Sequence, residues 1–255
     1  MLTMKRSGRF FSRDRAAVAG GLILICALAW AWLAPMHMAP STIPAPAPMH
    51  GHPWTSADAW SVFLMWTIMM AAMMIPGATP MVLEFAHTKA TRRVIAEVGL
   101  TLIFLVGYLG MWAAFSAIAT LAQWALQRNG LLSMTMASSS ATAAALTLLA
   151  AGVFQFTRLK RQCLVHCRSP MHTSEPTENR NALAAFTMGL HHGLFCVGGC
   201  WALMALLFVF GVMNLYAVAL LTTFVLLEKV LPRPGWLTRG AGVAFITWGL
   251  SLLVT

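Results

Sequence analysis

The chain has 255 residues, of which 59% are hydrophobic and 9% are charged, and its formal net charge is +10. This composition excludes a soluble globular domain and predicts a membrane protein that crosses the bilayer several times. No nucleic-acid-binding motif accompanies the positive charge, so nucleic acid is not an expected partner. Four of the five cysteines form two C-x3-C pairs, which is untypical of a secreted disulfide framework and indicates metal or redox use.

The N-terminal segment is signal-like. Residues 1–15 are rich in Lys and Arg, and the apolar run at residues 16–33 is long enough for a membrane span. The APMHMAPS that follows is only a weak cleavage site. We therefore interpret residues 1–15 as a basic cytoplasmic N-terminus and residues 16–33 as a retained signal-anchor span, with cleavage as the alternative.

Residues 34–56 are expected to form a loop, because they are too rich in proline for a helix. Methionine and histidine recur in this segment, and thioethers suit Cu(I) while imidazoles suit Cu(II) or Zn(II). The segment is either a metal-acquisition loop or a spacer in which these residues are incidental. Its candidate ligands are Met36, His37, Met38, Met49, His50 and His52.

A methionine stripe marks the second span, expected over about residues 58–74. Met65, Met69 and Met73 lie four residues apart on one helical line, and Met70 and Met74 lie on the next. Such a stripe alone is typical of adaptable packing, but beside other sulfur ligands it becomes a candidate metal surface. We expect this helix to kink or end near the two prolines that follow, Pro76 and Pro80.

The third and fourth spans, about residues 98–122 and 138–157, are expected to be scaffold. A polar loop is then predicted over residues 158–181, with the pattern C-x2-H-C. Cys163, His166 and Cys167 in this loop form either a soft-metal site outside the lipid or a set of reduced cytosolic side chains.

The apolar run at residues 182–227 is long enough for two spans joined by a tight turn near residues 211–214, and a last span is expected at about residues 239–254. His192, Cys196 and Cys200 lie four residues apart and therefore share one helix face, flanked by Met188 and Met204. Gly189 and Gly193 form the GxxxG pattern that lets another membrane helix approach closely.

The charge distribution predicts the orientation. With seven spans and a cytoplasmic N-terminus, 16 of the 17 Lys and Arg residues fall on one side and Arg128 alone on the other. The expected fold is an all-α polytopic transmembrane helical bundle of about seven spans, or six if the N-terminal segment is cleaved. In the bacterial inner membrane, residues 34–56 would face the periplasm and residues 57–255 would form a six-span metal-binding domain.

The donor chemistry favours a soft ion. Thiolate, thioether and imidazole suit Cu(I), whereas magnesium and calcium need oxygen ligands, and the chain has only seven Asp and Glu residues. Copper, as Cu(I), is therefore the expected cofactor.

Four stretches in order resemble a known family: MMAAMMIPGATPM, LKRQCLVHCRSP, GLHHGLFCVGGCWALMALLFVFGVMNL and VLLEKVLP. This family is the predicted metal-binding integral membrane proteins, described as membrane-bound copper chaperones associated with polyphenol oxidases. The resemblance covers roughly residues 60 to 254 and implies that Met69, Met70, Met73, Met74, Cys163, Cys167, Cys196 and Cys200 are metal ligands. The family usually has GCCW, whereas here Gly199 precedes Cys200, so one thiol is replaced.

We therefore expect a non-enzymatic, membrane-bound copper chaperone that binds Cu(I) and delivers it to a cuproenzyme or another partner; a copper donor protein is a further expected partner. A transmembrane transporter of copper or another soft metal is the first alternative. A haem or quinone redox subunit using His191 and His192 is a weaker one, because no other span holds a deep histidine, and a purely structural role is the last. The candidate ligands of the membrane domain are Cys196, Cys200, His192, Met69, Met70, Met73, Met74, Met204, Cys163, Cys167 and His166.

Overall fold

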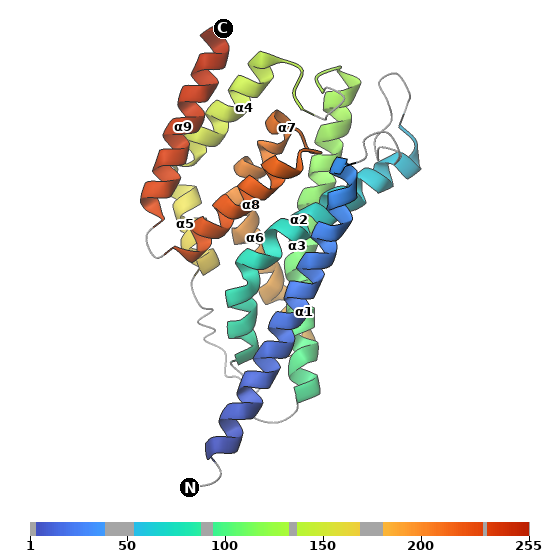
Figure 1. Ribbon diagram of the computed structural model, residues 1–255, viewed down its shortest axis with the longest axis vertical. Helices are drawn as coiled ribbons and strands as arrows, with labels where there is room; N and C mark the ends of the chain where they lie inside the picture. Colours follow the sequence, from blue (N-terminus) through green and yellow to red (C-terminus); the bar gives the residue numbers. More distant parts are fainter. Residues whose placement is uncertain are drawn as a thin grey trace.

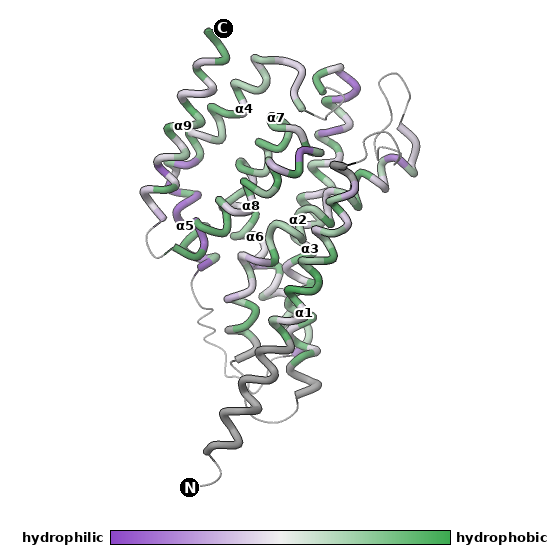
Figure 2. Tube along the Cα trace, in the orientation of Figure 1, coloured by the Kyte–Doolittle hydropathy of each residue, from purple (hydrophilic) through white to green (hydrophobic). Residues whose placement is uncertain are grey.

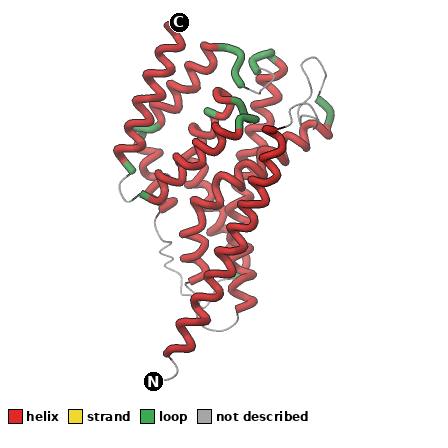
Figure 3. Tube along the Cα trace, viewed as in Figure 1, coloured by secondary structure: helices red, strands yellow, loops and turns green. Residues whose placement is uncertain are grey.

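The computed structural model describes residues 4–38, 54–87, 94–132, 137–168, 181–231 and 234–254. Within these ranges the chain is helical, with short connecting turns and no strand beyond one isolated bridge between Leu132 and Ser138 (Figure 3). The prediction of an all-α bundle is confirmed.

The first three helices are long. α1 spans Met4–Met38, α2 spans Ser56–His87 and α3 spans Val94–Arg128. The expected end of the second helix near its prolines is wrong, because Pro76 and Pro80 both lie inside α2. The expected kink is present, since α2 changes direction along its length, as helices with internal prolines do (Figure 1).

The other helices are shorter. They are α4 (Ala141–Phe154), α5 (Arg158–Arg168), α6 (Ala182–Ala205), α7 (Leu207–Phe210), α8 (Leu215–Val230) and α9 (Gly235–Val254). The predicted turn near residues 211–214 is confirmed and joins α7 to α8: Gly211 takes a positive φ of 93°, and the Asn214 side chain caps α8.

Three expectations need correction. Five helices in the described ranges are long and apolar enough to cross a membrane, or six if α4 and α5, which meet at a 65° bend, are counted as one span. The sixth expected span in chain order, the second half of the run at residues 182–227, corresponds to α8, which has only 16 residues. The segment 158–168 is not a loop but the amphipathic helix α5, and residues 34–38 continue α1 instead of starting the loop.

Glycines set the closest helix contacts. A Cβ on Gly189 of α6 would overlap the backbone carbonyl oxygen of Phe104 on α3, and one on Gly193 would lie 2.8 Å from Met111 Cβ. The predicted GxxxG surface is therefore the place where α6 packs against α3. This contact fixes the rotation of α6, and with it the direction of the cysteine stripe.

The helices form two groups in Figure 1. α4 and α9 pack against each other on one side of the bundle, while α1, α2, α3 and α6 form the longer part, and α5, α7 and α8 lie between them. Figure 2 shows that the long helices are predominantly hydrophobic, whereas hydrophilic residues are concentrated on α5 and near some helix ends.

Candidate metal centre

The cysteine stripe lies on α6 and faces the interior of the bundle. Asn181 fixes the start of this helix, because its side chain accepts a hydrogen bond from the backbone N–H of Ala184. Cys196 and Cys200 are 1% and 3% exposed, and Cys200 Sγ lies 2.8 Å from the carbonyl oxygen of Cys196, to which it donates. Both thiols are thus buried inside the bundle.

A small cavity of about 10 Å³ lies beside these cysteines, between α5, α6 and α8. Three thiols line it: Cys196 and Cys200 from α6, and Cys167 from α5. We call this cavity the thiol pocket; its other lining residues are Leu164, Phe195, Gly199, Val225, Glu228 and Lys229. The cysteine that the sequence assigns to a separate cytosolic cluster therefore joins the α6 stripe.

Lys229 of α8 reaches into the thiol pocket. Its Nζ donates a hydrogen bond to Cys196 Sγ over 3.0 Å and lies 3.9 Å from Met74 Sδ of α2. Its aliphatic stem passes Gly77 of α2, where an added Cβ would lie only 2.8 Å from Lys229 Cδ. A positively charged group is thus held between a thiol of α6 and a thioether of α2.

Tyr108 of α3 also contacts Cys196. Its hydroxyl lies 3.1 Å from Cys196 Sγ and donates to the carbonyl oxygen of Met74 over 3.4 Å. These contacts connect α2, α3 and α6 around one sulfur atom. The thiol of Cys196 is therefore the point at which most elements of the site converge.

His192, one turn before Cys196, is buried beside two aromatic rings of α3. Its ring centroid lies 6.1 Å from that of Phe104 and 5.8 Å from that of Tyr108. Within the described part of the chain, its Nε2 has no hydrogen-bond partner. The imidazole does not line the thiol pocket. It lies beside the ring of Tyr108, whose hydroxyl contacts Cys196.

A buried ion pair fixes α5 against α8 next to the pocket. Lys160 Nζ lies 2.9 Å from Glu228 Oε2, with side chains 0% and 2% exposed, and Thr238 of α9 donates to Glu228 Oε1 over 2.8 Å. Because Glu228 is matched by Lys160, it does not neutralise the adjacent Lys229. Among the described side chains, the Lys229 ammonium donates to two sulfur atoms, those of Cys196 and Met74.

Two predicted ligands on α5 lie outside the thiol pocket. Cys163 is buried against Gly198, where a Cβ would lie 2.9 Å from Cys163 Sγ. His166 is exposed, and its ring stacks on Phe195 with centroids 4.5 Å apart. The compact C-x2-H-C cluster expected from the sequence is therefore split, and only Cys167 reaches the pocket.

The remaining candidates are divided between the core and the undescribed segments. Buried in the core are Met69, Met70, Met73 and Met204. Outside the described residues lie Met49, His50 and His52, together with the side chains of Met36, His37 and Met38.

Thiols and thioethers are the donors that soft metal ions prefer. In the ranges that the structure describes, no group of three or more His, Cys, Asp or Glu side chains is arranged so that it could hold a metal ion, and this includes the three thiols of the pocket. Cys196 and Met74, however, already approach one cation, the Lys229 ammonium. Thiolate with thioether is the ligand combination that selects Cu(I).

Sequence reasoning missed three residues of this site: Lys229, Tyr108 and Gly77. Lys229 follows a long apolar run and precedes two prolines, so its charge was assigned to the membrane edge. Tyr108 was assigned to a scaffold span. Two signals were available in the sequence. Tyr108 is one of only two tyrosines in the chain. Lys229 is an ionisable residue at the end of an apolar run, and ionisable residues in membrane spans usually have a function.

Comparisons with known proteins identify the family. A family model described as "PpoB2: Copper chaperone" matches residues 63–252, a range that includes the whole thiol pocket, Met74 and Tyr108. The searches of curated proteins and of solved structures gave no match. Since the family model covers well over half of the sequence, the chain belongs to the PpoB2 family of copper chaperones.

Proposed function

We propose that this chain is a membrane-bound, non-enzymatic chaperone that holds Cu(I) in the thiol pocket and passes it to a cuproenzyme or another partner protein. The single observation that carries the proposal is the meeting of Cys167 with Cys196 and Cys200 around one cavity inside the bundle. Thiolates are strong ligands for Cu(I), and the cavity is small, so it leaves little room for water beside the ion.

Lys229 supplies a means of release. Its ammonium occupies the position between Cys196 and Met74 that a bound cation would need. Copper and the ammonium therefore compete for the same sulfur atoms, because two positive charges within about 4 Å repel each other strongly in a poorly solvated site. Return of the lysine to the pocket would weaken copper binding when a partner offers competing ligands.

The basic residues support a bacterial inner-membrane location with the N-terminus in the cytoplasm. Lys160 and Lys229 turn into the bundle, but most of the other basic residues still lie at the segment ends assigned to one side. In this orientation α5 and the thiol pocket lie towards the cytoplasmic side.

The two cysteines of α5 give a matched test of the proposal. We expect Cys167→Ser to lower the Cu(I) affinity of the detergent-purified protein about tenfold or more, because it removes one thiol from the pocket. Cys163→Ser, a change on the same helix outside the pocket, should leave the affinity within about twofold. Competition with a chromophoric Cu(I) chelator measures both, and equal affinities for the two variants would contradict the assignment.

A further inference from the structure

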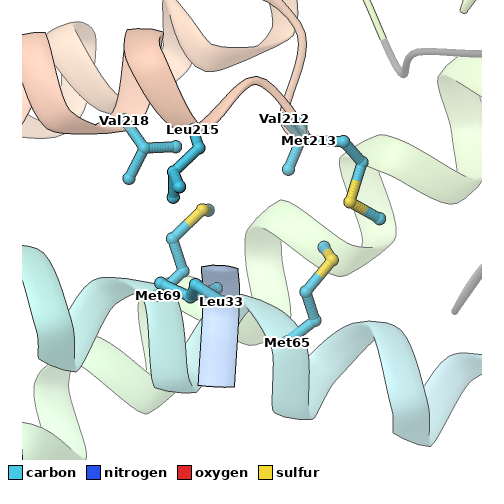
Figure 4. A pocket seen from close by; sticks show the side chains of 7 residues that line it. All are labelled: Leu33, Met65, Met69, Val212, Met213, Leu215 and Val218. Carbon is cyan, nitrogen blue, oxygen red and sulfur yellow. The ribbon is translucent and has the colours of Figure 1, made fainter. Parts of the chain in front are cut away.

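A second cavity lies next to Met65 and Met69 of the methionine stripe, between α2 and the turn that joins α7 to α8. Figure 4 shows the thioether side chains of Met65, Met69 and Met213 extending into this space. We call it the thioether pocket. It shares no lining residue with the thiol pocket.

The three methionines come from two elements that are fixed independently. Met65 and Met69 are one turn apart on α2 and are 2% and 1% exposed. Met213 lies in the turn between Gly211, with its positive φ, and Asn214, which caps α8. The turn geometry that ends α7 therefore places a third thioether opposite the two on α2.

The size and the lining of the thioether pocket limit what can bind there. Its volume is about 20 Å³, on the order of one small ion or water molecule, which excludes an organic ligand. The remaining lining side chains are aliphatic, including Leu33 and Val218, so none of the lining side chains is titratable or a conventional hydrogen-bond donor. A water molecule needs polar partners that these side chains do not offer, whereas a soft cation binds thioether sulfur directly.

We propose that the thioether pocket is a second metal site, which binds a soft monovalent cation such as Cu(I) or Ag(I) through Met65, Met69 and Met213. Three neutral thioethers bind such an ion more weakly than thiolates do, because they add no negative charge. The pocket is therefore a site for transient binding and not for storage.

The position of the thioether pocket on α2 suggests its role, and this step rests on the proposed function. Met69 is one turn before Met73, and Met74 lies 3.9 Å from the Lys229 ammonium in the other pocket. With a rise of about 1.5 Å per residue, Met69 and Met74 are separated by only about 7.5 Å along the helix. Buried Met70 and Met73 lie between them, so an ion can move from thioether to thioether towards the thiolates.

The test uses Ag(I), a soft ion that does not change its oxidation state, with the full-length protein in detergent. Thioethers release no proton when they bind a metal, whereas thiols do, so lowering the pH weakens only the thiol pocket. In a Cys196→Ser/Cys200→Ser background at about pH 5, we expect about one Ag(I) to stay bound. Adding Met65→Leu and Met213→Leu should remove it, since leucine fills a similar volume without a ligand atom.

Met81→Leu is the matched control, because Met81 is also buried on α2 but lines neither pocket. If the methionine double variant binds as much Ag(I) as its background, the thioether site is refuted even when the thiol pocket binds copper. If instead the serine variant leaves the tight Cu(I) affinity unchanged, the proposed function fails while the methionine site stands. Size-exclusion elution and thermal melting verify that each variant is folded.

Discussion

At the scale of single residues, the proposed function makes Lys229 the group that competes with copper in the thiol pocket. Its ammonium donates to Cys196 Sγ and is near Met74 Sδ, so it blocks a cation at that position. We expect Lys229→Met to raise the affinity for Cu(I) by at least about tenfold, because the repulsion disappears and a thioether replaces the amine. Chelator competition measures the affinity, and stopped-flow transfer to an acceptor should show slower release.

Arg128→Met is the control for the loss of one positive charge. Arg128 lies at the end of α3, with its guanidinium 5.4 Å from the centroid of the Trp124 ring, and it lines neither pocket. This variant should bind copper as the wild type does. Weaker binding by Lys229→Met would contradict the competition between ammonium and metal, and would indicate that the lysine holds the thiolate in place for the metal.

Gly199 offers a second test at this scale. A Cβ at this position would lie 3.6 Å from Cys163 Cβ and 3.8 Å from the Leu164 nitrogen, which are ordinary packing distances, and Gly199 lines the thiol pocket. We therefore expect Gly199→Cys to fold and to increase the Cu(I) affinity about tenfold by adding a thiol. The measurement is chelator competition under reducing conditions.

The neighbouring glycine provides the control. Gly198 does not line the pocket, and a Cβ there would lie 2.9 Å from Cys163 Sγ. Gly198→Cys adds the same thiol without placing it at the metal position, so it should give no gain in affinity. If both variants bind more tightly, the effect comes from an extra cysteine in general and not from the pocket.

At the scale of elements, α5 is the part that the sequence did not predict. Its many basic residues indicated a loop outside the lipid, but its buried residues Lys160, Cys163 and Cys167 are spaced i, i+3 and i+7, which is the pattern of one helix face. Cysteine is often buried, whereas lysine is rarely buried unless it forms an ion pair. The residue that pairs with Lys160, Glu228, is 68 residues away in the sequence. Pairing over such a distance is not visible in a single sequence.

The same ion pair predicts how α5 can be displaced. Lys160→Met leaves Glu228 buried without its cation, and we expect it to destabilise the protein by about 3–5 kcal/mol and to weaken copper binding by moving Cys167. The double variant Lys160→Met/Glu228→Met removes both charges and should regain most of the stability. Thermal unfolding in detergent measures both; a single variant as stable as the wild type would show that the pair does not fix α5.

At the scale of the whole molecule, hydrophobicity and glycine spacing predicted the bundle, the close approach of another helix at Gly189 and Gly193, and the turn near Gly211, while the structure identifies α3 as the approaching helix. These features depend on residues near one another in the sequence, or on patterns repeated along one helix. The thiol pocket depends instead on how α2, α3, α5, α6 and α8 are packed. The sequence therefore indicated most of the sulfur-bearing side chains of the proposed site but not which of them meet, nor that a lysine lies among them.

The most direct test of the account is the tight Cu(I) affinity of the Cys196→Ser/Cys200→Ser variant beside that of Cys26→Ser. Cys26 is on α1, where its Sγ lies 3.6 Å from the Ala72 carbonyl oxygen, and it lines neither pocket. We expect the double variant to lose the tightly bound ion, with a fall in affinity of at least about a hundredfold, and Cys26→Ser to retain it. Equal retention of tight copper by both variants would contradict the assignment of the thiol pocket as the copper site.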